Sequence, residues 1–222
     1  MNIVTRKLIL KELFINRSLI IGSSIAGALS VLIAMGGHVG FNIGALTWMT
    51  GLVAHGVMLA MYGVVNERKE NALLFVLSLP ISTGDYVRAK QLGLFLSFFI
   101  PWLISSAAAV ALIGFYPGGP HGLLPFVILM CGFLITNFSV VLCGALHARS
   151  EAVMTAVIVV TNMGVTLFIF LVGGLNSINK SMSGQTAEWS GTFWTVLIIE
   201  LCILTLAFVL PFFVAARRRD YI

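Results

Sequence analysis

The stretch that decides the fold is residues 18–66, SLIIGSSIAGALSVLIAMGGHVGFNIGALTWMTGLVAHGVMLAMYGVVN, in which no Asp, Glu, Lys or Arg occurs. Residues 91–148 form a second stretch without any of these charges. Apolar segments of more than about 18 residues that carry no charge are typical of membrane-spanning helices. The sequence therefore predicts a chain that is embedded in a bilayer.

The composition supports this prediction. Charged residues make up 9% of the chain and hydrophobic residues 59%, whereas a soluble domain has about 25% charged residues. The net charge of +5 comes without a basic run interleaved with aromatic residues, so it does not indicate nucleic-acid binding. The first apolar run is long and lacks a good cleavage site, which favours a retained span over a signal peptide.

The apolar runs predict an all-α integral membrane protein, with the whole chain 1–222 as a single transmembrane domain. The runs are continuously apolar and do not alternate, which favours helices over a β-barrel. A basic and apolar N-terminal segment, 2–17, is interpreted as a helix at the membrane interface. The six predicted spans are 19–37, 43–65, 92–115, 122–146, 152–175 and 194–215.

The distribution of Lys and Arg predicts the orientation, because cytoplasmic loops of membrane proteins hold an excess of these residues. If both termini lie in the cytoplasm, every Lys and Arg except Lys180 falls on the cytoplasmic side. The opposite orientation would leave Lys180 alone inside. We therefore expect a multi-pass protein with cytoplasmic N- and C-termini.

The loop between the second and third spans, 66–91, is longer than a simple turn requires. Within it, ERKENALLFVLSLPIS (67–82) places mixed charges before a short apolar segment, 72–79, which Pro80 ends. Arg88 and Lys90 are expected to anchor the third span at the headgroups. The spacing leaves two interpretations open: an amphipathic helix at the membrane surface, or a helix that docks into a groove on a cytoplasmic protein.

The stretch ERKENALLFVLSLPISTGDYVRAKQLG (67–93) resembles the loop between the second and third spans of ABC-2-type transporter permeases. The similarity lies in an acidic residue with basic neighbours, a Leu-rich short helix, the motif SLP, and a Lys that opens the third span. The six-span layout and the long outer loop before the last span are also similar. Asn71 departs from the pattern, since many relatives have glycine there.

This resemblance implies a permease subunit of an ATP-binding cassette exporter in the bacterial cytoplasmic (inner) membrane. In this family two permease subunits pair, and each docks one ATPase subunit through the coupling helix of this loop. A homodimer is expected here, and a heterodimer with another permease stays open. ATP and magnesium would bind the partner, because no Gly-Lys pair and hence no Walker A loop occurs in this chain. The chain would not itself be an enzyme, and its ATPase-docking residues would be Glu67, Arg68, Lys69, Glu70, Leu73, Leu74, Leu77 and Pro80.

Small residues recur every four positions in the first span, at Gly22, Ala26, Ser30 and Ala34. Such spacing lets helices approach closely in lipid. It is interpreted either as packing within one subunit or as the dimer interface, which the family places partly on this span.

Three polar residues in the later spans are candidates for a substrate path: Asn162, Thr166 and Glu200. An acidic residue inside a span usually faces a cavity or a partner. Hydrogen bonds between helices, or a carboxylate that reaches the headgroups, are the simpler alternatives.

Two other classes of function remain open from the sequence. The chain could be a membrane enzyme that acts on a lipid through Glu200 with His55 or His121, or a non-catalytic scaffold. The histidines lack the spacing of metal ligands, and Cys131, Cys143 and Cys202 lack CxxC spacing, so no metal site is expected. The transported substrate cannot be deduced from the sequence.

Overall fold

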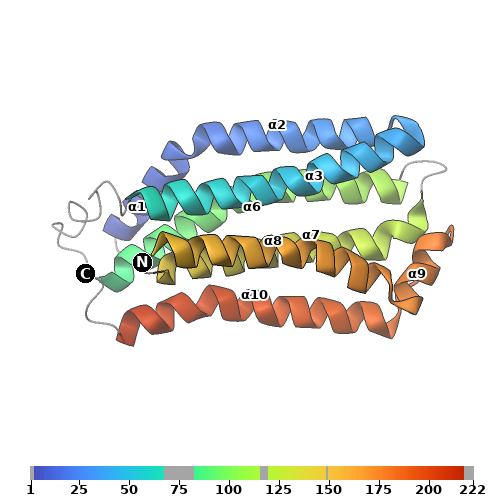
Figure 1. Cartoon of the computed structure of the whole chain (residues 1–222). Helices are drawn as coiled ribbons and strands as arrows, with labels where there is room; N and C mark the ends of the chain where they lie inside the picture. The colour runs from blue at the N-terminus through green and yellow to red at the C-terminus, as the bar shows by residue number, and fades with distance from the viewer. Residues whose placement is uncertain (1–2, 68–82, 116–119, 149, 218–222) are drawn as a thin grey trace.

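The computed structural model describes residues 3–67, 83–115, 120–148 and 150–217, and these residues form a helical bundle without strands (Figure 1). Six of the helices are long and apolar enough to cross a membrane. The prediction of an all-α protein with six spans is thus confirmed. The start of α1 and the end of α10 lie at one end of the bundle, and α9 lies at the other (Figure 1).

The six long helices alternate in direction along the bundle (Figure 1). In chain order the elements are α1 (Ile3–Ile15), α2 (Arg17–Ala34), α3 (Gly37–Ala60), the π-helical segment η1 (Met61–Asn66), α6 (Thr83–Phe115), the 3₁₀ turn η2 (His121–Leu123), α7 (Leu124–His147), α8 (Glu151–Gly173), α9 (Asn176–Ser183) and α10 (Gly191–Arg217).

Two boundaries differ from the predicted spans. The turn between α2 and α3 is tighter than expected, because Gly37 adopts a left-handed φ of 80° that glycine accepts without strain. Helix α6 begins at Thr83 and not near residue 92. Its first turns carry charges that hydropathy assigns to a loop, although the backbone is already helical there.

Helix α7 lies at the centre of the bundle and packs against α3, α6, α8 and α10. Its side chains are mostly buried, whereas α8 exposes most of its surface, as expected for a helix that faces lipid. Aromatic rings stack in the core: the ring centroids of Phe98 on α6 and of Phe138 on α7 lie 4.1 Å apart. Helix α2 lies outside this core and packs against α3 and α6.

A close approach between α2 and α3 depends on Gly44. A Cβ atom at this position would lie 2.7 Å from the Cβ of Ala34 and would also collide with the backbone of Ser30. We expect Gly44→Ala to lower the apparent Tm of the purified chain by roughly 2–10 °C, since overpacking costs about 1–3 kcal/mol. Gly51 is the matched control, because nothing lies within 4 Å of its Cβ position on the same helix. Equal Tm values for Gly44→Ala and Gly51→Ala would contradict this packing.

Candidate functional site

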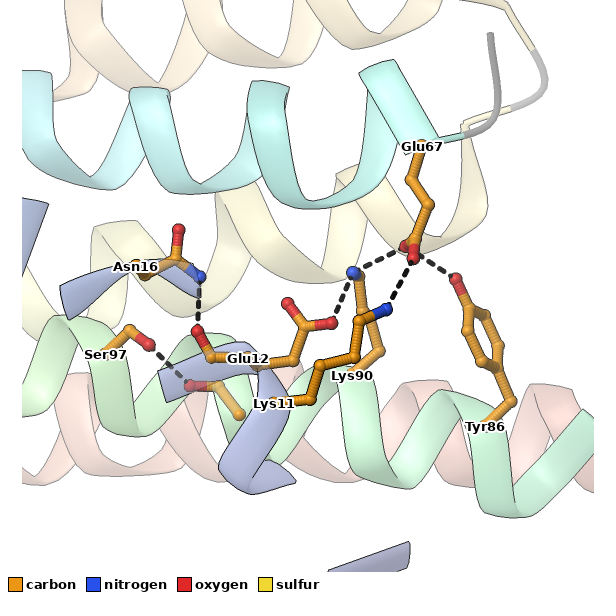
Figure 2. A network of polar contacts seen from close by, with 8 residues as sticks. Lys11, Glu12, Asn16, Glu67, Tyr86, Lys90 and Ser97 are labelled. Carbon is orange, nitrogen blue, oxygen red and sulfur yellow. Dashed lines mark hydrogen bonds and ion pairs between the residues drawn. The ribbon is translucent and has the colours of Figure 1, made fainter. Parts of the chain in front are cut away.

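A buried cluster of charges joins the two ends of the predicted coupling segment to the N-terminal helix (Figure 2). It consists of Glu12 on α1, Glu67 directly after η1, and Lys90 on α6, with Lys11 and Tyr86 at its edge. We call these five residues the ion-pair cluster. Glu67 directly precedes residue 68, and Tyr86 and Lys90 lie in the first turns of the helix that follows residue 82.

Lys90 is the centre of the cluster. Its Nζ lies 2.8 Å from Oε1 of Glu12 and 2.5 Å from Oε2 of Glu67. The side chain of Lys90 is only 5% exposed, and those of the two glutamates are 8% and 12% exposed. A lysine ammonium can donate three hydrogen bonds, so Lys90 serves both carboxylates at once.

Two further groups complete the environment of Glu67. The hydroxyl of Tyr86 donates to Oε2 of Glu67 over 3.0 Å, and Nζ of Lys11 lies 3.8 Å from Oε1. Lys11 is partly exposed, so it contributes less than Lys90. With two carboxylates and two ammonium groups the cluster is electrically balanced, as burial of charge requires.

Helix α1 brings Glu12 to the cluster, because the face of this helix that packs inward contains polar and charged residues. Thr5, Ile9 and Glu12 are its buried residues among the side chains described, Asn16 directly after it is also buried, and this face packs against α6. Gly93 on α6 makes the approach possible, because a Cβ there would lie 2.6 Å from the Cβ of Glu12. Nδ2 of Asn16 donates to the carbonyl of Glu12 over 2.9 Å and fixes the end of the helix.

The structure changes the interpretation of two predicted residues. Lys90 was expected to reach the headgroups, and this expectation is wrong, because two carboxylates hold its ammonium inside the protein. Glu67 was expected to contact an ATPase, but its carboxylate points inward to Lys90 (Figure 2). The other predicted docking residues lie outside the described residues: Arg68, Lys69, Glu70, Leu73, Leu74, Leu77 and Pro80.

The stripe of small residues on α2 divides into two halves. Ser30 and Ala34 lie at the close contact with Gly44 of the same chain. Gly22 and Ala26 are exposed and line a cleft of about 260 Å³ between α2 and α3. The half with Ser30 and Ala34 is therefore used within the subunit, and the half with Gly22 and Ala26 is free on the surface of this chain.

The candidate residues of the substrate path lie on two helices that both pack against α7. Glu200 on α10 is 4% exposed, faces Gly132 of α7, and has no hydrogen-bond partner for either carboxylate oxygen among the described residues. Asn162 on α8 is partly buried, and its Oδ1 also has no partner in this part of the chain. Thr166 is exposed.

The histidines considered for an enzyme are bound elsewhere. His55 contacts Ser23 and the carbonyl of Ser97, and His121 contacts the carbonyl of Ile113. Within the described ranges, no three His, Cys, Asp or Glu side chains are placed to hold a metal ion. Glu200 is thus not paired with either histidine in this structure.

A comparison with models of protein families identifies the family of this chain. The family model described as ABC-2 family transporter protein matches residues 7–216. The chain belongs to the ABC-2 transporter family. The matched region of this ABC-2 family protein contains all six membrane-spanning helices and the whole ion-pair cluster. No curated protein and no solved structure matches it.

Membership of the ABC-2 family makes this protein a multi-pass membrane component of a transporter. Reasoning from the sequence missed Glu12 as a member of the ion-pair cluster of this family protein. A signal was present, because Glu12 is the only acidic residue before Glu67 and stands in a helix that is otherwise basic and apolar. An isolated acidic residue in a segment rich in basic residues indicates an internal ion pair, although the sequence does not show which lysine is its partner.

Proposed function

We propose that this chain is the permease subunit of an ATP-binding cassette exporter that is driven by a separate ATPase docked on residues 67–82. The observation that carries the proposal is the ion-pair cluster, which ties both ends of segment 68–82 to each other and to α1. A segment that transmits movement needs a stiff base, since a loose attachment would dissipate the displacement. The family supplies the expectation of an ATPase partner.

The proposed mechanism follows from the rigid attachment that the ion-pair cluster makes. ATP and magnesium bind the partner ATPase subunits and draw them together, and the docked segments move with them. The ion-pair cluster passes this displacement to the ends of α3 and α6 and to α1. The spans then rearrange between two states and open a path outward. Export, and not import, is proposed from the family resemblance.

We further propose that two copies of the permease and two ATPase subunits form the working assembly in the bacterial cytoplasmic membrane. Both chain termini are then cytoplasmic, since Lys180 is the only basic residue whose place in the chain falls at the other end. Glu200, Asn162 and Thr166 are assigned to the substrate path around α7. The buried carboxyl of Glu200 supports this assignment, because such a group in a span usually serves a functional site.

Co-purification tests the proposed function. The tagged chain is expressed together with an ABC ATPase encoded beside it, extracted in mild detergent and purified through its tag. We expect the ATPase to remain bound in equal amount and to hydrolyse ATP. Purification of the folded permease without any ATPase, in membranes where that ATPase is abundant, would overturn the proposal.

The dimer is tested by cross-linking at the free half of the α2 stripe. In a chain whose three cysteines are replaced by alanine, Gly22→Cys is expected to form a covalent dimer in membranes upon mild oxidation. The control retains the natural Cys202, which is exposed on α10, and we expect at most a tenth of the dimer yield there. Equal yields from the two positions would indicate random collision and count against an interface at Gly22.

A further inference from the structure

The membrane part of α6 contains a break in its hydrogen bonding at Pro101. Proline has no N–H group, so the carbonyl four residues earlier, that of Ser97, loses its regular helical donor. Ser97 is fully buried at 0% exposure. A carbonyl without a partner at this depth is costly, because lipid chains supply no hydrogen-bond donor to replace the missing one.

His55 of α3 supplies the missing donor. Its Nε2 lies 3.3 Å from the carbonyl oxygen of Ser97, and the imidazole is 3% exposed. Since a carbonyl oxygen only accepts, Nε2 must carry the hydrogen, which leaves Nδ1 of the neutral ring as an acceptor. The hydroxyl of Ser23 on α2 lies 2.7 Å from Nδ1 and 2.7 Å from the carbonyl oxygen of Leu19, so its single hydrogen is shared between these two acceptors. His55 therefore links α2, α3 and α6 at the proline break.

The ring of His55 is held more firmly on one side than on the other. It stacks on Phe98 with a centroid distance of 5.9 Å, and Phe98 in turn stacks on Phe138. On the side of Ser23 it borders the cleft between α2 and α3, which is lined largely by small residues. The contact of His55 itself with α2 is the hydrogen bond to Ser23, whereas α2 packs closely on α6 at Gly27, where a Cβ would lie 2.7 Å from the Cβ of Ser105.

The proline break divides α6 into two halves with different attachments. The cytoplasmic half is held by Lys90 in the ion-pair cluster and by Gln91, whose Nε2 donates to the carbonyl of Phe208 on α10 over 2.6 Å. Beyond Pro101, Nε1 of Trp102 donates to the carbonyl of Cys131 on α7 over 2.9 Å. His55 contacts α6 at the junction between these two halves.

The cytoplasmic cluster and this junction lie on one face of α6. Lys90, Gly93, Ser97 and Pro101 are spaced by three and four residues, which places them in a row along the helix. Gly93 packs on Glu12, and Oγ of Ser97 donates to the carbonyl of Gly93 over 2.9 Å (Figure 2). From Lys90 to Pro101 the row extends about 16 Å into the membrane.

We propose that His55 is a positioning residue for transport: it locks the proline break of α6 to α2 and α3, so that the cytoplasmic half of α6 and these two helices move as one unit. A displacement at the ion-pair cluster then reaches the middle of the membrane without being lost at Pro101. The polar side chains of Ser23 and His55 in the bundle are explained by this role.

The first test is a double-mutant cycle on the thermal unfolding of the chain in lipid nanodiscs. His55→Phe keeps an aromatic ring that can stack on Phe98 but removes both ring nitrogens. We expect it to lower the apparent Tm by about 3–10 °C. In a Pro101→Ala background the fall should be at most a third as large, because the backbone N–H that this substitution restores then serves the carbonyl of Ser97. An equal fall in both backgrounds would overturn the proposal.

The second test measures the junction directly. Spin labels are placed at Leu29 on α2 and Leu103 on α6, which are both exposed, in a chain without other cysteines that is diluted with unlabelled chain. We expect one narrow distance distribution, a distribution at least twice as broad in His55→Phe, and recovery in His55→Gln, whose amide N–H can donate to Ser97. A distribution that stays narrow in His55→Phe would show that His55 does not position the helices. Both tests use the chain alone, so their failure is distinguishable from failure of the permease proposal.

Discussion

Replacing Lys90 by methionine is expected to destabilise the folded chain strongly. Methionine has a similar length but no charge, so Glu12 and Glu67 would remain buried without their shared cation. Removal of one partner of a buried ion pair costs about 3–5 kcal/mol. For a chain of this size we expect the apparent Tm to fall by roughly 6–20 °C, measured on the purified protein by thermal unfolding in detergent or nanodiscs.

Lys180→Met is the matched control for this prediction. Lys180 pairs with Glu188 over 3.4 Å, but its side chain is 74% exposed, and exposed pairs contribute little to stability. We expect no measurable change in Tm for this variant. A second control combines Lys90→Met with Glu12→Gln and Glu67→Gln, which removes the uncompensated charges and should recover at least half of the lost Tm. Similar Tm values for Lys90→Met and Lys180→Met would show that the cluster does not stabilise the protein.

Leu74→Asp is expected to have the largest effect on function. Residue 74 lies outside the described residues, and the prediction rests on its place in the apolar segment 72–79. A carboxylate in the centre of a docking surface would have to be desolvated without a partner. We expect at least a tenfold loss of co-purified ATPase, while the amount of inserted chain and its Tm stay unchanged.

Leu79→Asp serves as the matched control, because residue 79 belongs to the same apolar segment but lies about 140° around a helix from residue 74. It introduces the same charge away from the predicted docking face, so the ATPase should remain bound. If Leu74→Asp retained its ATPase and hydrolysed ATP at the normal rate, the docking role of residues 67–82 would have to be abandoned. Loss of the inserted chain in both variants would instead indicate a role of this segment in folding.

The spans could be predicted from the sequence because membrane burial depends on composition along a single segment. The composition of a long uncharged run such as 18–66 indicates that it lies in a membrane, whichever segments pack against it. Hydropathy does not mark the start of α6 at Thr83, although Ser82 and Asp85 have the spacing of a capping box that predicts a helix beginning there. Hydropathy marks the edge of the hydrocarbon layer. A helix can continue beyond this edge as long as its backbone and side chains have hydrogen-bond or ion-pair partners. In α6, Lys90 has such partners inside the protein.

The ion-pair cluster depends on contacts between residues that are far apart in the chain, such as Glu12 and Lys90. A single sequence shows the types of these residues but not their pairing. The face of α1 illustrates the limit: Ile9 and Glu12 are buried side by side, while Leu10 and Phe14 are exposed. An analysis based on amphipathic pattern alone would orient this helix by its apolar residues, although packing on α6 and the ion pair to Lys90 determine its orientation.

The π-helical segment η1 at Met61–Asn66 has a consequence for how related transporters can diverge. One residue more in a helical turn rotates everything that follows by about 100° around the axis. Gain or loss of a single residue here would therefore rotate the end of this span relative to the rest of the bundle. Length variation at this one turn thus offers related transporters a way to change the direction in which the chain leaves the bundle.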